Sequence, residues 1–225
     1  MKNVWIVIPA FNEGEVLGDV VRSAVARGFS VVVVDDGSKD LSGEIAYRAG
    51  AHVCRHPINL GQGAALQTGI DFALGHDADA VVTFDADGQH SLDDASAMVS
   101  RLARGDVDVV LGSRFRGEVV GMASSRRWLL RAATIYTRMT SGLRVTDTHN
   151  GLRCLSQRAA LQIRIRQNRM AHASEILNKI GSLGLRYVEV PCTIAYTDYS
   201  RAKGQRMSGA LTILVDLAMG RLYRS

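Results

Sequence analysis

The feature that most constrains this chain is a set of continuous apolar runs, each of which ends abruptly in polar residues. Val31–Val34 and Val81–Phe84 are rich in β-branched residues and show no regular alternation of polar and apolar positions. Such runs are typical of strands that are buried on both faces, as in a parallel sheet covered by helices. The chain is therefore predicted to form a layered α/β structure around a parallel sheet.

Strand-like and helix-like segments alternate along the first half of the sequence. The predicted strands are Val4–Ile8, Ser30–Val34, Ala51–Cys54, Val81–Phe84 and Val107–Leu111. The predicted helices between them are Gly14–Arg27, Leu41–Ala49, a segment that opens at Asn59 and runs to Leu74, and Leu92–Ala103. Short connections between alternating strands and helices predict a mostly parallel sheet with helices on both faces.

The second half of the sequence continues with longer polar breaks between its elements. We expect helices at Arg126–Ser141, Gln157–Gln167 and Glu175–Leu183 (the last capped by Ser174), a strand at Tyr187–Tyr196 and a final helix at Ser208–Tyr223. At 225 residues the chain suits one α/β domain over residues 1–200, with a basic loop and an amphipathic helix at 201–225.

Polar side chains gather where the predicted parallel strands end. The clusters are Asn12-Glu13, Asp35-Asp36, Asp85–Gln89 and Ser113-Arg114. The carboxyl ends of parallel strands meet at one edge of a sheet, and ligands of such sheets bind outside that edge. The four clusters therefore predict a site for a nucleotide-type ligand together with a metal ion.

Two carboxylates follow the strand Val81–Phe84. Side chains alternate along a strand, so Asp85 and Asp87 lie on the same face. Carboxylates that close repel each other unless a cation or a proton lies between them. With the Gln89 amide they offer three oxygen ligands, which suits Mg²⁺ or Mn²⁺. A polar loop that merely follows a strand is the alternative interpretation.

Charge is unevenly distributed along the chain. Residues 1–100 hold 6 Lys or Arg against 14 Asp or Glu, whereas residues 101–225 hold 21 against 8. The balance of +13 in the rear part favours a polyanionic partner, namely phosphates, an anionic membrane surface or nucleic acid, although a solvated basic surface has the same charge. The apolar face of Ser208–Tyr223 has basic flanks, which predicts a helix that lies on a membrane or packs against protein.

Cysteine usage and hydropathy indicate the compartment. Cys54, Cys154 and Cys192 are scattered and lack the spacing of a disulfide framework or a zinc site, which favours a reducing compartment. No segment approaches the roughly 20 apolar residues of a spanning helix, and the N-terminus has no signal-peptide pattern. We therefore expect a cytoplasmic protein that is peripheral at the cytoplasmic face of the membrane.

Five motifs in a fixed order resemble those of a known family. They are Pro9-Ala10-Phe11-Asn12-Glu13, Asp35-Asp36-Gly37-Ser38, Asn59-x-Gly61-x-Gly63, Asp85-Ala86-Asp87-Gly88-Gln89-His90 and Gly112-Ser113-Arg114-Phe115. Each motif is weak alone, but their order and spacing closely resemble the family 2 glycosyltransferases. Within this family the chain is most similar to the dolichol- or polyprenyl-phosphate mannosyltransferase-like branch, over residues 4–200.

The resemblance implies a GT-A fold, which is a Rossmann-like nucleotide-sugar domain, and roles for individual residues. The nucleotide sugar would be bound by Pro9, Ala10, Phe11, Glu13, Asp35, Asp36, Gly63, Asp85 and Ala86. Asp85, Asp87 and Gln89 would hold Mg²⁺ or Mn²⁺, and the catalytic residues would be Asp87, Arg114 and Glu175. The basic loop adds Arg201 and Lys203 as candidates for the acceptor phosphate.

The expected reaction is inverting transfer of a sugar from a nucleotide diphosphate to an acceptor. Asp36, with Asp35 as the fallback, can accept a hydrogen bond from a uracil or guanine ring N–H, which predicts a UDP- or GDP-linked donor. A lipid-phosphate acceptor is already ionised, whereas a sugar hydroxyl needs a general base. Many relatives carry two carboxylates for that role, but Ala173-Ser174-Glu175 offers only Glu175. The basic rear half favours a polyprenyl phosphate, in the synthesis of cell-envelope glycans or glycolipids.

Other protein classes fit the sequence less well. A sugar nucleotidyltransferase would carry a glycine- and arginine-rich loop near the N-terminus, and a nicotinamide oxidoreductase a glycine fingerprint after the first strand. Pro9-Ala10-Phe11 stands there instead. A non-catalytic protein that binds sugar nucleotides or lipids is an alternative that turnover would exclude. The expected partners are the donor, the lipid phosphate, an anionic membrane and either a second copy or a small membrane protein, but no nucleic acid.

Overall fold

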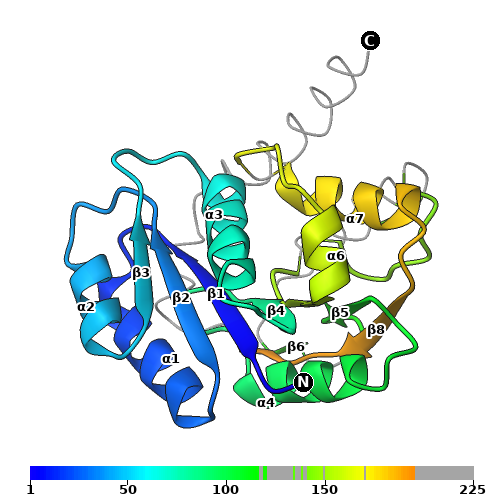
Figure 1. Ribbon diagram of the computed structural model, residues 1–225, viewed down its shortest axis with the longest axis horizontal. Helices are drawn as coiled ribbons and strands as arrows, with labels where there is room; N and C mark the ends of the chain where they lie inside the picture. Colours follow the sequence, from blue (N-terminus) through cyan, green and yellow to red (C-terminus); the bar gives the residue numbers. More distant parts are fainter. Residues whose placement is uncertain are drawn as a thin grey trace.

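The computed structural model of the protein shows an α/β fold built on one large sheet. The structure describes residues 1–116, 119–120, 134, 138, 141–148, 150–169 and 171–195. Seven strands form the large sheet in the order β3-β2-β1-β4-β7-β5-β8, and two short strands, β6 and β9, form a second sheet. The predicted fold class is confirmed by this mostly parallel arrangement (Figure 1).

The first half of the chain follows the predicted alternation of strands and helices. The strands are β1 (Val4–Ala10), β2 (Ser30–Asp35), β3 (His52–Arg55), β4 (Ala80–Thr83) and β5 (Val109–Ser113). The helices are α1 (Gly14–Ala26), α2 (Ser42–Arg48), α3 (Gln62–Leu74) and α4 (Leu92–Leu102). Strand β5 is shifted by two residues from its predicted start, so that it runs directly into the Ser113-Arg114 cluster.

The later elements add β7 and β8 to the large sheet, on the side of β4 away from β1. They are β6 (Val119–Val120), β7 (Arg153–Ser156), α6 (Gln157–Gln162), α7 (His172–Ser182), β8 (Tyr187–Pro191) and β9 (Ile194–Ala195). Strand β7 was not predicted from the sequence. It lies between β4 and β5 and runs antiparallel to both, with Val82 and Val110 each paired to Cys154. A four-residue strand in an otherwise polar stretch carries too short a pattern to be recognised from sequence alone.

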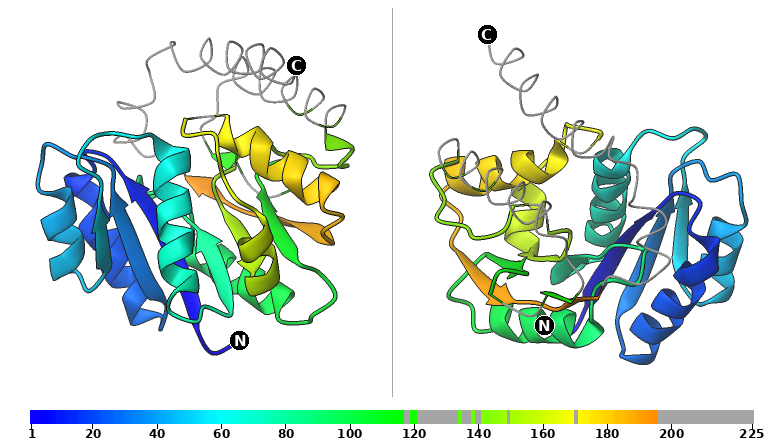
Figure 2. Two further views of the ribbon diagram at one scale, coloured as in Figure 1. Left: turned by 45° about the horizontal axis from the view of Figure 1, so that its top comes forward. Right: turned by 180° about the vertical axis from the view of Figure 1, so that it is seen from behind.

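Helices cover both faces of the sheet, as predicted. On one face, Ile6 and Ile8 of β1 pack in a core with Leu17 of α1 and Met98 of α4. On the opposite face, Val7 packs in a second core with residues of α3, α6 and α7. Helices α3 and α6 lie on one side of the sheet, and α1 and α4 on the other (Figure 1 and Figure 2). Because successive side chains of β1 enter different cores, its sequence is apolar without alternation.

Three element boundaries differ from the sequence prediction. The helix predicted at Gln157–Gln167 ends at Gln162, because the following residues are extended and bury Ile163 and Ile165 alternately. Helix α7 begins at His172, so Ser174 lies inside its first turn and does not cap it. The strand predicted at Tyr187–Tyr196 is divided into β8 and β9, and its last residue lies outside the described residues.

Several expectations fall on residues that the structure does not describe. They are most of the helix predicted at Arg126–Ser141, the basic loop with Arg201 and Lys203, and the helix predicted at Ser208–Tyr223. In the described part of the chain, none of the helices has the length and hydropathy of a membrane span.

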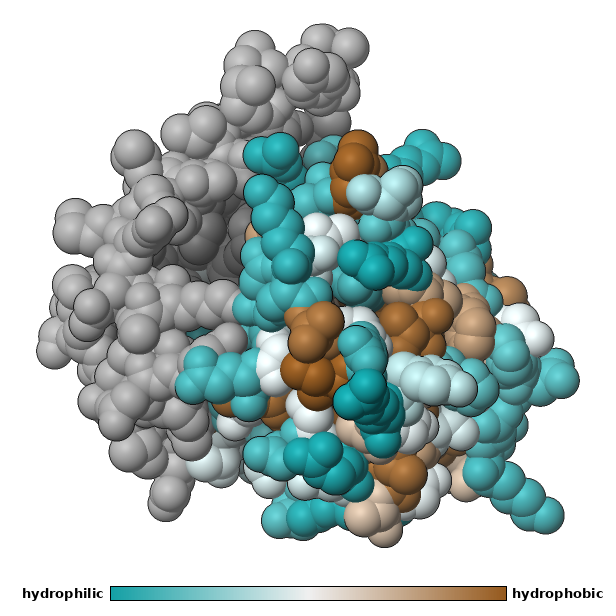
Figure 3. Space-filling model, turned by 90° about the vertical axis from the view of Figure 1, so that its left-hand side faces the viewer, coloured by the Kyte–Doolittle hydropathy of each residue, from teal (hydrophilic) through white to brown (hydrophobic). Residues whose placement is uncertain are grey.

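On the face that carries α2 and β3, apolar residues such as Leu41 and Tyr47 are exposed, and polar residues separate the apolar groups (Figure 3).

Candidate active site

The polar clusters that follow β1, β2, β4 and β5 meet around one cleft of about 520 Å³. The parallel register pairs Ala10 with Asp35, which brings the ends of β1 and β2 side by side. Of the residues predicted from the sequence, those that line the cleft are Pro9, Ala10, Phe11, Glu13, Asp36, Asp85, Ala86, Asp87, Gln89 and Arg114. The cleft therefore lies at the carboxyl ends of the strands, where the sheet topology predicts a ligand.

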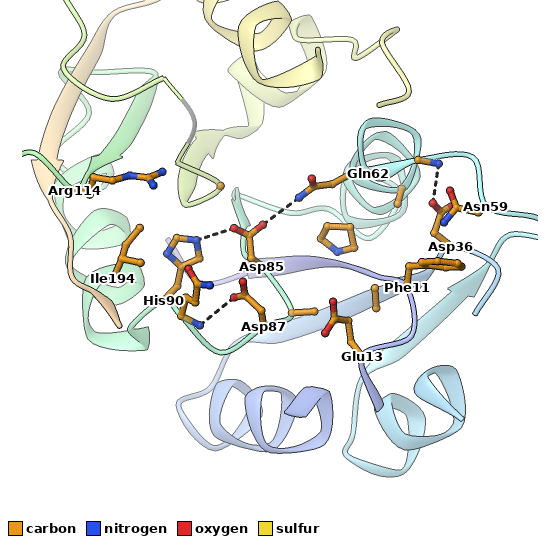
Figure 4. A pocket seen from close by; sticks show the side chains of 17 residues that line it. Phe11, Glu13, Asp36, Asn59, Gln62, Asp85, Asp87, His90, Arg114 and Ile194 are labelled. Atoms are coloured by element: carbon orange, nitrogen blue, oxygen red, sulfur yellow. Dashed lines mark hydrogen bonds and ion pairs between the residues drawn. The ribbon is translucent and has the colours of Figure 1, made fainter. Parts of the chain in front are cut away.

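Phe11, Asp36 and Asn59 form one end of the cleft (Figure 4). Phe11 is 40% exposed, which leaves its ring available to stack on a flat ligand. The Asp36 carboxylate is buried and accepts hydrogen bonds from the backbone N–H groups of Leu60 (2.9 Å) and Gly61 (2.7 Å). This end combines an exposed aromatic face with a fixed acceptor, which are the elements of a nucleobase site.

Asp85 and Asp87 lie near the middle of the cleft (Figure 4). Asp85 accepts hydrogen bonds from Gln62 Nε2 (3.2 Å) and His90 Nε2 (3.0 Å), which hold both of its oxygens in place. Asp87 Oδ1 accepts one from the backbone N–H of Gln89 (3.1 Å). The two carboxylates thus share the cleft, but in the described residues they are not joined by a third acidic, histidine or cysteine ligand into a preformed metal cluster.

The surroundings of Asp85 and Asp87 shift the pKa values of these two carboxyls in opposite directions. Burial raises the pKa of Asp87, and the neighbouring Asp85 carboxylate raises it further. Burial also acts to raise the pKa of Asp85, but the hydrogen bond from His90 and the charge of Arg153 outweigh it and hold that pKa below its ordinary value. Asp85 is therefore the stable anion, and Asp87 is the carboxyl that gains most from a cation beside it.

Arg114 lies at the end of the cleft opposite Phe11 and Asp36 (Figure 4). Its backbone N–H (3.1 Å) and its Nε (2.6 Å) both donate to Oδ2 of Asp147. The backbone N–H of Asp147 in turn donates to Oε1 of Glu189 (3.3 Å), which belongs to β8. These buried contacts hold the guanidinium at the cleft wall.

A comparison with known families decides the class of protein. The sequence pattern described as glycosyl transferase family 2 matches residues 5–163, which is more than half of the chain.

The chain belongs to this family.

It is thus a glycosyltransferase that uses a nucleotide sugar, as its motifs predicted.

The sequences of curated relatives match this family 2 transferase over nearly its whole length. An uncharacterized protein of Methanocaldococcus jannaschii is 36% identical and covers 98% of this chain and 93% of its own. The UDP-N-acetylglucosamine–dolichyl-phosphate N-acetylglucosaminyltransferase of Methanococcus voltae is 30% identical, with coverage of 97% and 96%. The polyprenol monophosphomannose synthase of Mycolicibacterium smegmatis is 27% identical, with coverage of 100% and 90%. The names of the last two relatives support the polyprenyl-phosphate branch that the motifs indicated.

Solved structures share the fold. The glucosyl-3-phosphoglycerate synthase from Mycobacterium tuberculosis in complex with phosphoglyceric acid superposes with a TM-score of 0.73 at 20% identity, covering 96% of this chain and 79% of its own. The same enzyme in complex with Mn²⁺ and UDP-glucose gives a TM-score of 0.71 at 21% identity, again with 96% and 79% coverage. The likeness confirms the predicted GT-A fold.

Two of the predicted nucleotide-sugar residues do not line the cleft of the transferase. Asp35 is buried beside the turn that follows β2, where its Oδ1 accepts from the backbone N–H of Ser38 (2.8 Å). Gly63 faces a different part of the chain, because a Cβ atom there would lie 2.0 Å from the carbonyl oxygen of Gln167. A glycine is required at position 63 by the close packing of that loop on α3.

Glu175, expected as a base, also lies away from the cleft. Its carboxylate accepts hydrogen bonds from the backbone N–H groups of Arg166 (2.9 Å) and Gln167 (2.8 Å) and pairs with Lys179 (2.9 Å). The loop that it holds contacts the start of α3, where the backbone N–H of Gly63 donates to the carbonyl of Asn168 (2.8 Å). Glu175 thus anchors a loop.

The structure also brings residues to the cleft that the sequence analysis did not select. Asn59, Gln62 and His90 line it, and all three lie inside or between the quoted motif positions, so the motifs carried that signal. Gly151 also lines the cleft, and its backbone lies so close to Asp85 that a Cβ atom there would be 2.3 Å from Oδ2. Ile194 reaches the cleft from β9, and no motif in the sequence marks it.

Proposed function

We propose that this family 2 transferase moves a sugar from a UDP- or GDP-linked donor to a polyprenyl phosphate, with inversion and with the help of Mg²⁺ or Mn²⁺. The observation that carries the proposal is the order of groups along the cleft. Phe11 and Asp36 stand at one end, Asp85 and Asp87 in the middle, and Arg114 at the other end (Figure 4). This order matches a nucleobase, a diphosphate and an acceptor phosphate.

The nucleobase end supports a uracil or guanine donor. Both of these bases have a ring N–H that a carboxylate can accept, and cytosine lacks it. Asp36 lines the cleft and Asp35 does not, so Asp36 takes this role. The relative from Methanococcus voltae is named for a UDP-linked donor, and the glucosyl-3-phosphoglycerate synthase was solved with UDP-glucose.

The middle of the cleft suits a divalent cation that a diphosphate helps to hold. Mg²⁺ is commonly bound by one or two carboxylates together with substrate phosphates, and not by a complete protein cage. Asp85 and Asp87 supply that number of carboxylates, and Gln89 adds an amide at the cleft. A cation bound there would supply Lewis-acid stabilisation of the departing diphosphate. Solved structures of the same fold hold Mg²⁺ or Mn²⁺ with UDP.

The acceptor end supports a phosphate and not a neutral hydroxyl. Arg114 brings a guanidinium, held in place by its ion pair with Asp147, to the cleft, where it can contact an ionised acceptor beside the donor. A phosphate oxygen attacking from the face opposite the diphosphate inverts the anomeric configuration and needs no base. A hydroxyl acceptor would need one, and Glu175 is engaged in holding the Arg166 and Gln167 backbone. Relatives named for dolichyl phosphate and polyprenol agree with this choice.

A lipid acceptor implies work at a membrane surface. We propose that the basic loop with Arg201 and Lys203 and the helix expected at Ser208–Tyr223 bring the transferase to the cytoplasmic face of the membrane, in cell-envelope glycan or glycolipid synthesis. Basic groups near an anionic surface each contribute about 1 kcal/mol of attraction. Liposome flotation at low salt tests this part. Full-length protein should float with anionic and not with neutral vesicles, and protein that stays soluble with both contradicts it.

Turnover tests the central proposal. The protein is incubated with a panel of UDP-, GDP- and CDP-sugars, a short-chain polyprenyl phosphate and Mn²⁺, and lipid-linked sugar and released nucleotide are measured. We expect product with a UDP- or GDP-sugar and none after chelation. Nucleotide-sugar binding without lipid-linked product under any condition would show a binding protein, and product only with a hydroxyl acceptor would overturn the acceptor class.

A further inference from the structure

A buried chain of side chains lies behind the nucleobase end of the cleft. His56 follows β3, and its Nδ1 lies 2.7 Å from Oδ1 of Asp36. Its Nε2 lies 3.0 Å from Oγ1 of Thr68, which belongs to α3. The His56 and Asp36 side chains are only 10% and 4% exposed. The chain thus joins the end of β2, the segment after β3 and helix α3 through polar atoms only.

The chemistry of these groups sets the direction of both hydrogen bonds. A carboxylate can only accept, so the hydrogen on the His56 ring that faces Asp36 is carried by Nδ1. In the neutral ring Nε2 is then an acceptor, and the Thr68 hydroxyl donates to it. A histidine whose tautomer and orientation are set by the group behind it is a general device for fixing a functional side chain.

Counting the acceptor positions of Asp36 shows what His56 does. A carboxylate offers about four lone-pair positions, two on each oxygen. His56 and the backbone N–H of Leu60 occupy both positions on Oδ1, and the backbone N–H of Gly61 occupies one on Oδ2. Among the described residues nothing takes the last position on Oδ2. Since Asp36 lines the cleft, that position is available to a ligand, and it accepts only a donor group.

We propose that His56, held by Thr68, is a positioning residue that fixes the Asp36 carboxylate for reading the nucleobase of the donor. The proposal rests on the proposed function and adds the residues that give the site its preference for a base with a ring N–H. His56 does not line the cleft and acts only through Asp36. It is the one side chain among the described hydrogen-bond partners of that carboxylate, so it is the partner that substitution can remove.

The test uses three substitutions at one position. His56→Asn keeps an N–H donor near the place of Nδ1, His56→Gln places its amide near Nε2 and too far from Asp36, and His56→Leu removes all donors. The dissociation constants of UDP, GDP and CDP are measured by calorimetry in the full-length protein with Mn²⁺. Melting temperatures are measured in parallel. His76→Leu, at an exposed histidine whose Nδ1 contacts the Phe72 carbonyl, is the matched control.

We expect His56→Leu and His56→Gln to weaken binding of the preferred nucleotide about tenfold, the effect of losing one hydrogen bond to a charged group. Preference over CDP should fall by the same factor, because CDP gains nothing from a fixed acceptor. His56→Asn should stay within about threefold of the wild type. In turnover, the Leu variant should raise KM for the donor and leave kcat nearly unchanged, and the control should change neither.

A purely structural role predicts a different outcome. The Leu variant would then melt earlier but keep its preference over CDP, and Asn would be no better than Gln, which overturns the proposal. If the position 56 variants do not fold, Thr68→Val against Thr68→Ser gives the same comparison with a smaller expected shift, and equal preference in that pair also overturns it. Failure of the proposed function is distinguishable, because it shows in the wild type, which would then bind none of the three nucleotides or form no lipid-linked sugar, whatever the position 56 variants do.

Discussion

Acidic side chains have different surroundings in the two halves of this family 2 transferase. In the first half, Asp36, Asp85 and Asp87 lie at the ends of parallel strands and line the cleft. In the second half, Asp147 and Glu189 are buried against arginines and backbone N–H groups. The carboxylates that follow β2 and β4 at the cleft are therefore available to a ligand, whereas Asp147 and Glu189 hold the second half of the chain together.

Basic residues of the second half also contribute to contacts within the protein. The rear half of the sequence carries a large positive balance, yet many of its described arginines are paired within the protein. Arg116 pairs with Glu189, Arg186 with Asp108 and Arg101 with Asp106, and even Arg114 at the cleft is held by Asp147. Part of the charge that suggests a polyanionic partner is thus used in internal contacts. The part left for a membrane or lipid phosphate includes Arg201 and Lys203, which lie outside the described residues.

The largest effect is expected from a cleft carboxylate. Asp87→Ala should lower turnover on the order of 10³-fold, because it removes one of the two carboxylates proposed to hold the cation at the diphosphate. Stability should be equal or higher, since burial and the nearby Asp85 raise the pKa of this carboxyl and disfavour its charge. Initial rates and urea unfolding measure the two quantities. Undiminished turnover, or activity that survives a chelator, would contradict the metal assignment.

The same type of residue in the other half should act on stability. Asp147→Asn leaves the buried Arg114 guanidinium facing a neutral amide, and breaking a buried pair typically costs about 3–5 kcal/mol in the free energy of unfolding. Urea unfolding measures the loss. The control is Asp106→Asn, at a more exposed pair with Arg101, which should unfold like the wild type. Loss of activity at unchanged stability would instead place Asp147 with the cleft carboxylates.

His172 offers a prediction that depends on pH. Burial, together with the charge of the nearby Arg153, lowers the pKa of this histidine to about 4. The unfolded chain takes up the proton near pH 6.5, so the folded form loses stability as pH falls from 6.5 towards 4, by up to about 3 kcal/mol. His172→Asn keeps a donor for the Arg169 carbonyl and does not titrate. Its stability should fall less steeply over that range, and parallel curves would refute the assignment.

The smallest effect is expected at Glu175. Loss of a general base typically lowers the rate about 10²- to 10⁴-fold, whereas loss of a loop anchor does not touch the reacting atoms. Glu175→Gln keeps one acceptor oxygen for the loop, so turnover should stay within about threefold and stability should fall by about 1 kcal/mol. A hundredfold lower kcat with a hydroxyl acceptor would restore Glu175 as the base and remove this difference between the two halves.

Much of the cleft was predictable because local sequence patterns decide it. The apolar run of β4 ends at Thr83, so Asp85 and Asp87 come at the sheet edge wherever the strand is buried. The same reasoning placed Phe11 after β1, Asp36 after β2 and Arg114 after β5. Residues that reach the cleft through long-range contacts were not predictable in this way. Ile194 comes from β9, and Gly151 is placed by its approach to Asp85.

The sequence by itself determined the alternation of strands and helices, the family and the edge of the sheet at which the ligand is proposed to bind. Each of these depends on residues that are close together in the chain, through periodicity, burial and strand direction. Only the tertiary structure decided that β7 enters between β4 and β5, that Gly63 meets the Gln167 carbonyl, and that Glu175 holds a loop. These outcomes depend on which distant backbone groups come within hydrogen-bonding or contact distance, and no local pattern encodes that.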